Sequence, residues 1–224
     1  MVNHIYRNLP NLASILGIAP LGLLLMPQGY QLLIPIILYN NFMDDLDGVI
    51  AAQLNLRSKY GATLDNVCDA VSHTLFVLVA GMHFGGLCAA ASAVAAICII
   101  LRITSRLESP PQTPKGSATN ELIRHLFFVL LLGQLFEFNE AIPLTLIFVL
   151  HGFSMLAPFE MPHLIRSRAL TMRSVALVNL ALLVAWLVPA TLAPIAACFI
   201  FTYLYSLLTK GCLWLHVPKK LSSQ

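Results

Sequence analysis

The chain has 224 residues, of which 58% are hydrophobic and 10% are charged, with a formal net charge of +3 and a mean hydropathy of +0.80. So few polar side chains cannot cover the surface of a soluble domain, and so many apolar ones exclude a disordered chain. No stripe of Lys and Arg alternates with aromatic residues, so nucleic acid is not expected as a partner. The composition predicts an all-α, polytopic membrane protein in which residues 1–224 form a single transmembrane domain.

Apolar runs separated by Pro, Gly and charged residues predict about eight membrane-spanning helices along the chain. A helix needs about 20 apolar residues to cross a hydrocarbon core roughly 30 Å thick. The expected spans, in chain order, are Leu9–Met26, Gln31–Leu56, Gly61–Met82, Gly86–Leu107, Leu122–Phe136, Ala141–Ala157, Ser174–Val188 and Ala190–Leu208. The segments Glu137–Glu140 and Pro189–Pro194 are expected to be tight connections between neighbouring spans.

The positive charges support an even number of spans. With eight spans both termini lie on one side of the membrane, and all 13 Lys and Arg residues fall on that side. The loops on the opposite side carry Glu137 and Glu140 and no positive charge. Because Lys and Arg are enriched in cytoplasmic loops, this distribution predicts that both termini face the cytoplasm. A six-span arrangement also keeps the termini inside, but it scatters the loops.

All five Asp residues lie in one window, from 44 to 69, which joins the second expected span to the third. Four of them fall, with small residues, on two helix faces: Asp44, Asp47, Gly48 and Ala51 on the first, and Gly61, Asp65 and Asp69 on the second. Asp45 lies outside this pattern and is expected to be solvated or to support the other acids. Ionisable groups in or beside a membrane span are expensive, so this window is the expected functional site.

A short turn makes these two helices antiparallel neighbours, so the four carboxylates face one another. Facing carboxylates cannot all ionise without cations. Hard divalent ions with oxygen ligands, Mg²⁺ or Mn²⁺, are the natural compensation, and one or two of them are expected. Acids exposed at helix ends beside a basic turn would explain one or two carboxylates but not four. A transporter or cation channel would need acids near mid-membrane in several spans, whereas here they belong to one helix pair.

The window resembles the signature of the CDP-alcohol phosphotransferase family, which is D-x-x-D-G-x-x-A-R followed by G-x-x-x-D-x-x-x-D after a spacer that is eight residues long here. Every fixed position is met except one, where Ala52 stands in place of the family's arginine. The missing guanidinium removes either a phosphate contact or a structural ion pair. An inactive or specialised homologue is therefore the alternative interpretation, and Arg57 does not lie on the face where it would replace that charge.

The resemblance implies transfer of a phosphatidyl group from CDP-diacylglycerol to a small alcohol, with release of CMP. A site with two metal ions would neutralise the phosphate oxygens and orient the attacking hydroxyl. Carried onto this sequence, the motif makes metal ligands of Asp44, Asp47, Asp65 and Asp69, a catalytic base of Asp69, and nucleotide contacts of Asp47, Gly48, Ala51 and Gly61. The resemblance also implies a homodimer in a bacterial or archaeal cytoplasmic membrane, in contact with lipid and with its active site facing the cytoplasm.

The residues after the last motif aspartate indicate the acceptor alcohol. Family members that use phosphorylated acceptors commonly carry Lys or Arg directly after it, whereas here Ala70 follows. The run 65–73 instead resembles the D-S-L-A-D-x-V-S-F stretch of phosphatidylserine synthases, and a phosphatidylglycerophosphate or phosphatidylinositol-phosphate type synthase is the alternative. The candidate acceptor contacts are Arg102, Arg106, Ser72 and His73. The commoner roles are topology charges for the two arginines and a buried, hydrogen-bonded side chain for the histidine.

Overall fold

Eight α-helices and two 3₁₀ segments make up most of the residues that the computed structural model describes, which are 6–108, 118–157 and 172–216. The α-helices are α2 (Leu9–Ile18), α3 (Leu33–Gln53), α4 (Lys59–Phe84), α5 (Gly86–Glu108), α6 (Ala118–Phe136), α7 (Ala141–Leu156), α9 (Met172–Leu187) and α10 (Pro189–His216). The 3₁₀ segments η1 (Ala19–Leu25) and η2 (Gly29–Leu32) join α2 to α3. No strand occurs in these three ranges, so the all-α prediction is confirmed.

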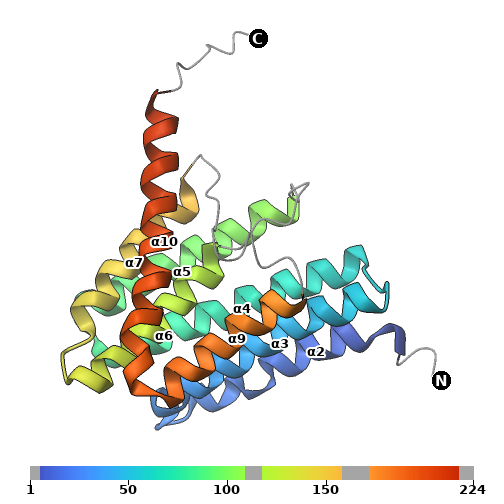
Figure 1. Cartoon of the computed structure of the whole chain (residues 1–224), viewed down its shortest axis with the longest axis horizontal. Helices are drawn as coiled ribbons and strands as arrows, with labels where there is room; N and C mark the ends of the chain where they lie inside the picture. The colour runs from blue at the N-terminus through green and yellow to red at the C-terminus, as the bar shows by residue number, and fades with distance from the viewer. Residues whose placement is uncertain (1–5, 109–117, 158–171, 217–224) are drawn as a thin grey trace.

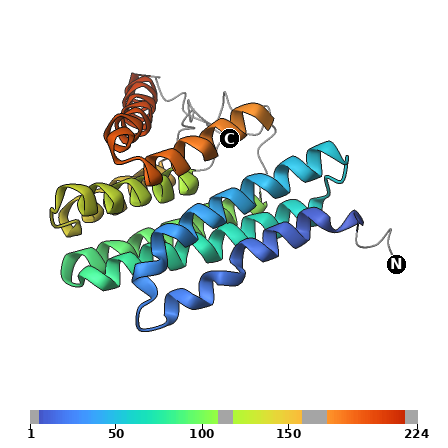
Figure 2. The same ribbon diagram turned by 60° about the horizontal axis from the view of Figure 1, so that its bottom comes forward.

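Most helices lie side by side along the long axis of the molecule. The helix α4 packs against α5, α2 against α3, and α5 against α7, while α9 packs against α3 and α10. Figures 1 and 2 show that α10, drawn in red, differs from the others because it crosses the bundle steeply and its C-terminal end extends beyond it. Each expected span corresponds to one α-helix, with the first divided between α2 and η1.

The helix α6 lies at the centre of the bundle. Of its 19 residues, 14 are buried, and they occur on every side of the helix. A helix that is buried all round needs neighbours on every side. These neighbours are α3, α4, α7 and α10, which belong to both halves of the chain. This central position brings α6 against the helices that carry the aspartates.

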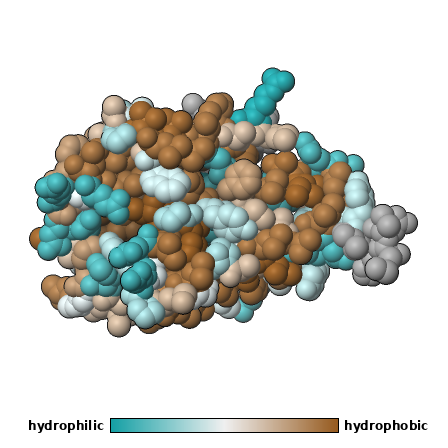
Figure 3. All heavy atoms as spheres, turned by 90° about the horizontal axis from the view of Figure 1, so that it is seen from below, coloured by the Kyte–Doolittle hydropathy of each residue, from teal (hydrophilic) through white to brown (hydrophobic). Residues whose placement is uncertain are grey.

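The surface of the molecule suits a lipid environment. Three segments are long and apolar enough to cross a membrane, namely α4, α5 and residues Pro189–Leu213 of α10, and shorter apolar helices accompany them. Large side chains such as Ile97 of α5 and Ile142 and Leu146 of α7 are exposed. Figure 3 shows hydrophobic atoms over most of one face, with hydrophilic atoms gathered mainly towards its two ends. These features agree with the predicted polytopic membrane protein.

Two predicted boundaries are wrong. The segment Pro189–Pro194 is not a connection, because α10 begins at Pro189 and Pro194 lies inside the helix. Proline is tolerated in the first turn of a helix, where its missing N–H would have had no partner. The helix α6 begins at Ala118, four residues before the expected Leu122. By contrast, Glu137–Glu140 joins α6 to α7 as predicted.

The charge count also needs a correction. Arg124 was expected among the loop charges, but the structure places it inside α6, where it is buried. Counting charges by their place in the sequence cannot distinguish a residue at a loop from one on the inner face of a helix. Five of the 13 positive residues lie outside the described ranges, namely Lys115, Arg166, Arg168, Lys219 and Lys220.

Candidate functional site

The antiparallel pair α3 and α4 brings three of the four motif aspartates together. Carboxylate oxygens of Asp44, Asp47 and Asp65 all lie within 4.8 Å of one another. The turn between the two helices is short, and Ser58 caps α4 by accepting a hydrogen bond from the Gly61 N–H at 2.9 Å. The two helix faces that the sequence analysis identified therefore meet at these three residues. Clustered carboxylate oxygens are the ligands that Mg²⁺ and Mn²⁺ prefer.

Asp69 is the fourth motif aspartate. It lies one helical turn beyond Asp65 on α4, outside the 4.8 Å group but close enough to Asp65 to interact with it electrostatically. Its Oδ1 atom lies 3.7 Å from Nε2 of His73, which follows one turn later on the same face. Ser72 is fully buried and donates to the backbone carbonyl of Asp69 at 3.3 Å. Asp69 thus lies next to the cluster of Asp44, Asp47 and Asp65 and close to a histidine.

Two further helices supply hydrogen bonds to the clustered carboxylates. Ser14 of α2 donates a hydrogen bond to Oδ2 of Asp47. Asn120 of α6 donates from Nδ2 to Oδ2 of Asp44 at 3.3 Å. Sequence reasoning missed both residues, because a hydroxyl and an amide in apolar helices have no fixed spacing to the motif. Hydrogen-bond donors of this kind fix the orientation of carboxylate ligands.

The small residues of the motif differ in what surrounds them. A Cβ atom added at Gly48 would meet nothing within 4 Å, so open space lies beside α3 at that position. A Cβ atom at Gly61 would lie 3.1 Å from both Asn11 Oδ1 and Ser58 Oγ, so this glycine permits a close approach between α4 and α2. Ala51 is half-buried near the end of α3. Gly48 is therefore the member of this set with room for a ligand next to it.

The two candidate acceptor arginines lie on α5, and Asp45 lies on α3. Arg102 and Arg106 of α5 are both half-buried, and Arg106 lies close enough to Asp65 to interact with it electrostatically. Asp45 was expected to be solvated or to support the other acids. The structure shows it 5% exposed, with its Oδ2 accepting a hydrogen bond from Nδ2 of Asn179 at 2.7 Å. It therefore ties α3 to α9 on a different side of the helix from the cluster.

A second group of polar side chains is buried around α6, and sequence reasoning missed it. Nη1 of Arg124 donates to Oε1 of Glu121 at 3.0 Å, and one ring nitrogen of His125 lies 2.7 Å from one of His151. Tyr203 of α10 stacks on His151 at a centroid distance of 4.3 Å. The sequence does hold one sign of this buried group, a Glu and an Arg three residues apart in an apolar run. That spacing places both side chains on one face of a helix.

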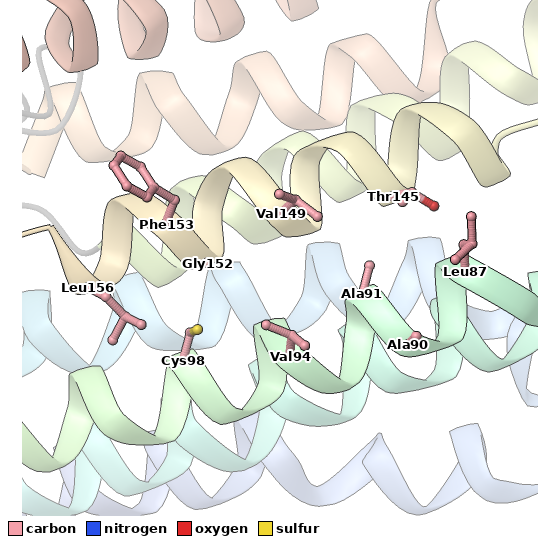
Figure 4. Close-up of a pocket in the computed structure, with 10 residues that line it drawn as sticks. All are labelled: Leu87, Ala90, Ala91, Val94, Cys98, Thr145, Val149, Gly152, Phe153 and Leu156. Carbon is pink, nitrogen blue, oxygen red and sulfur yellow. The ribbon is translucent and has the colours of Figure 1, made fainter.

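An apolar groove between α5 and α7 contrasts with both polar groups. Figure 4 shows its lining, in which the polar atoms of the labelled side chains are the hydroxyl of Thr145 and the thiol of Cys98. The remaining lining side chains, such as Leu87, Val94 and Phe153, are hydrocarbon. This groove has no carboxylate and no charged side chain among its lining residues, so it is unsuited to the chemistry of the aspartate cluster.

Two comparisons with known proteins bear on the site. A family model described as CDP-alcohol phosphatidyltransferase matches residues 7–149, a range that contains the aspartate cluster and the buried pair of α6. An uncharacterized protein of Aquifex aeolicus (strain VF5) is 32% identical to this chain over 82 residues. The aligned part covers 35% of this chain and 42% of that protein, so less than half of that relative is matched.

Proposed function

This chain belongs to the CDP-alcohol phosphatidyltransferase family, and from that premise we propose that it transfers the phosphatidyl group of CDP-diacylglycerol to the hydroxyl of serine, giving phosphatidylserine and CMP. The family is a transferase family of phospholipid synthesis, so the chain is an enzyme of that class. The observation that carries the proposal is the convergence of Asp44, Asp47 and Asp65 within 4.8 Å.

These residues fit the divalent ions on which the family generally depends. Three carboxylate oxygens from two helices offer a hard, negatively charged ligand set. Asp44, Asp47 and Asp65 would hold the metal, Mg²⁺ or Mn²⁺, with Asp69 completing a site for two ions. When bound, the ions would neutralise the charge on the diphosphate oxygens. Ser14 and Asn120 keep the carboxylates of Asp47 and Asp44 oriented towards one another.

The side chains of the protein have two further tasks in the proposed reaction. Open space beside Gly48 admits the nucleotide diphosphate next to the cluster, where Asp47, Ala51 and Gly61 also contact it. Asp69 accepts the proton of the acceptor hydroxyl as that oxygen attacks the phosphorus and CMP leaves. A positioned general base of this kind typically contributes 10²- to 10⁴-fold to the rate. Asp69 lies one turn beyond Asp65 and within 3.7 Å of His73, a position next to the cluster that suits a residue acting on the acceptor.

Serine is proposed as the acceptor because Ala70 follows Asp69 where a phosphate-binding cation would otherwise stand. Synthases of phosphatidylglycerophosphate or phosphatidylinositol-phosphate type are the second candidate.

At the position of the missing motif arginine, Ala52 is exposed near the end of α3. Arg106 brings a positive charge close to Asp65 and so compensates for that loss. We further propose that the site and both termini face the cytoplasm and that the enzyme is a homodimer.

The test is an acceptor competition in vesicles. The purified protein is supplied with CDP-diacylglycerol, Mg²⁺ or Mn²⁺, and labelled serine, glycerol 3-phosphate or inositol phosphate in separate reactions. The expected result is serine label in the lipid with equimolar release of CMP, and loss of both after chelation of the metal. Label entering lipid from a phosphorylated acceptor would support the second candidate. Absence of CMP release with every acceptor would identify an inactive homologue.

A further inference from the structure

Helix α6 carries a buried ion pair that the chemistry proposed above does not use. The side chains of Glu121 and Arg124 are 6% and 3% exposed, and their charged atoms lie 3.0 Å apart. Burying two charges removes the hydration of both, and a hydrophobic pair of the same volume is often at least as stable. The fold therefore gains little stability from this pair. A role in binding explains better why two charged side chains are buried here.

The position of the pair relative to the site is set by its neighbours on α6. Asn120 donates a hydrogen bond to Asp44 of the metal-type cluster. Arg124 follows four residues later, so it lies on the same face, one turn of about 5.4 Å along the helix. There it is close enough to His73 to interact with it electrostatically, and His73 in turn lies 3.7 Å from Asp69. The pair thus lies next to the cluster and the proposed base.

Two nitrogens in this region have hydrogen-bonding capacity that is not used within the described residues. Nε of Arg124 and Nδ1 of His73 are buried and have no hydrogen-bond partner there. Both side chains are more than nine-tenths buried. Buried polar atoms in native proteins are nearly always paired, and an unpaired one points to a bound polar group. These two nitrogens come from α6 and α4, which pack against each other.

The charges of the pair favour one class of acceptor. Arg124 alone would attract any anion, but Glu121 beside it repels a phosphate carrying two negative charges. An α-amino acid presents an ammonium and a carboxylate on one carbon, so it can match Glu121 and Arg124 together. Its binding replaces the internal ion pair by two pairs with the ligand and leaves no buried charge uncompensated.

We propose that Glu121 and Arg124 form the acceptor subsite and select a zwitterionic amino acid over a phosphorylated alcohol. Arg124 binds the carboxylate of the acceptor and Glu121 binds its ammonium, which holds the acceptor hydroxyl near Asp69. This inference rests on the proposed function, because it assigns to specific residues the choice of serine made there.

The experiment compares acceptor kinetics in vesicles containing CDP-diacylglycerol. The double variant Glu121→Gln/Arg124→Gln keeps a neutral, hydrogen-bonding pair, and its KM for serine should rise by about 10- to 100-fold, the range for losing a hydrogen bond to a charged group. Its KM for CDP-diacylglycerol should stay within about twofold of the wild type, because the nucleotide site is intact. The single variant Glu121→Gln leaves Arg124 uncompensated, so the ratio of glycerol 3-phosphate to serine transfer should increase.

The matched control is Glu140→Gln, the same chemical change in the connection at the far end of α6, which should leave both acceptor KM values unchanged. A wild-type KM for serine in the double variant would overturn the subsite while leaving the proposed function intact. If the double variant does not fold, the conservative variant Glu121→Asp, which keeps both charges but shortens one side chain, decides instead, and an unchanged KM for serine overturns the proposal. A wild-type protein that transfers no serine would overturn both the acceptor subsite and the proposed acceptor.

Discussion

The charged groups on the α3–α4 pair and those on α6 lie in neighbouring parts of the bundle, yet they are balanced in different ways. Asp44, Asp47 and Asp65 carry charges of the same sign within 4.8 Å when they ionise, and the hydrogen bonds they receive do not cancel those charges. On α6, Glu121 and Arg124 carry opposite charges and neutralise each other. A cluster of like charges therefore requires a ligand of opposite charge, whereas a neutral pair is stable without one and can select a ligand that is itself neutral overall.

The largest effect is expected at the like-charged cluster. Replacing Asp65 by Asn removes one ligand charge and should lower phosphatidyl transfer by at least about 1000-fold, more than the loss of a single transition-state hydrogen bond usually costs. The rate of CMP release in vesicles measures this effect. Asp45→Asn is the control, because Asp45 is an acid of the same helix pair that accepts a hydrogen bond from Asn179 and lies outside the cluster. Equal losses in the two variants would show that the cluster has no special role.

A smaller effect, on stability, is expected at the neutral pair. Replacing Arg124 alone by Gln leaves Glu121 buried and uncompensated, which should destabilise the fold by about 3–5 kcal/mol. Replacing both residues by Gln should restore most of that loss, because no charge is then left unpaired. Thermal unfolding in detergent measures both variants. If the double variant were as unstable as the single one, the idea of mutual neutralisation would be wrong.

The smallest effect is expected from a residue that only orients a carboxylate. Ser14→Ala removes the hydroxyl that donates to Asp47, and loss of such a supporting partner typically weakens metal affinity by about 10- to 100-fold. The concentration of Mn²⁺ that gives half-maximal activity should rise accordingly, with little change at saturating metal. Ser92→Ala is the control, because its fully buried hydroxyl bonds within its own helix. A change in maximal rate alone would argue against an orienting role.

The convergence of the like charges could be predicted from the sequence because it depends on local geometry. Spacings of three and four residues place side chains on one helix face, and a short turn sets two such faces against each other. Nothing beyond the window 44–69 was needed to bring Asp44, Asp47 and Asp65 together. The family motif covers the same short stretch, so both arguments used the same residues.

The contacts of α2 and α6 with this cluster could not be predicted in the same way. Ser14 and Asn120 are separated from their partners by 33 and 76 residues. Such pairs meet only through the packing of whole helices, and the spacing of residues does not encode it. The place of Arg124 was predicted incorrectly for a related reason. The rule that relates positive charge to topology uses position along the chain, whereas the ion pair with Glu121 lets this arginine lie inside the bundle.

The enclosure of α6 has a consequence for the order in which the protein is assembled. Two of its neighbours, α7 and α10, follow it in the chain, so during synthesis α6 emerges before the helices that will cover it. Until those helices arrive, the charged side chains of Glu121 and Arg124 must be covered by α3 and α4 alone, or α6 must stay at the lipid–water boundary. Maturation of the enzyme should therefore wait for the last helix to dock, and chains cut before α10 should remain immature although their aspartate motif is complete.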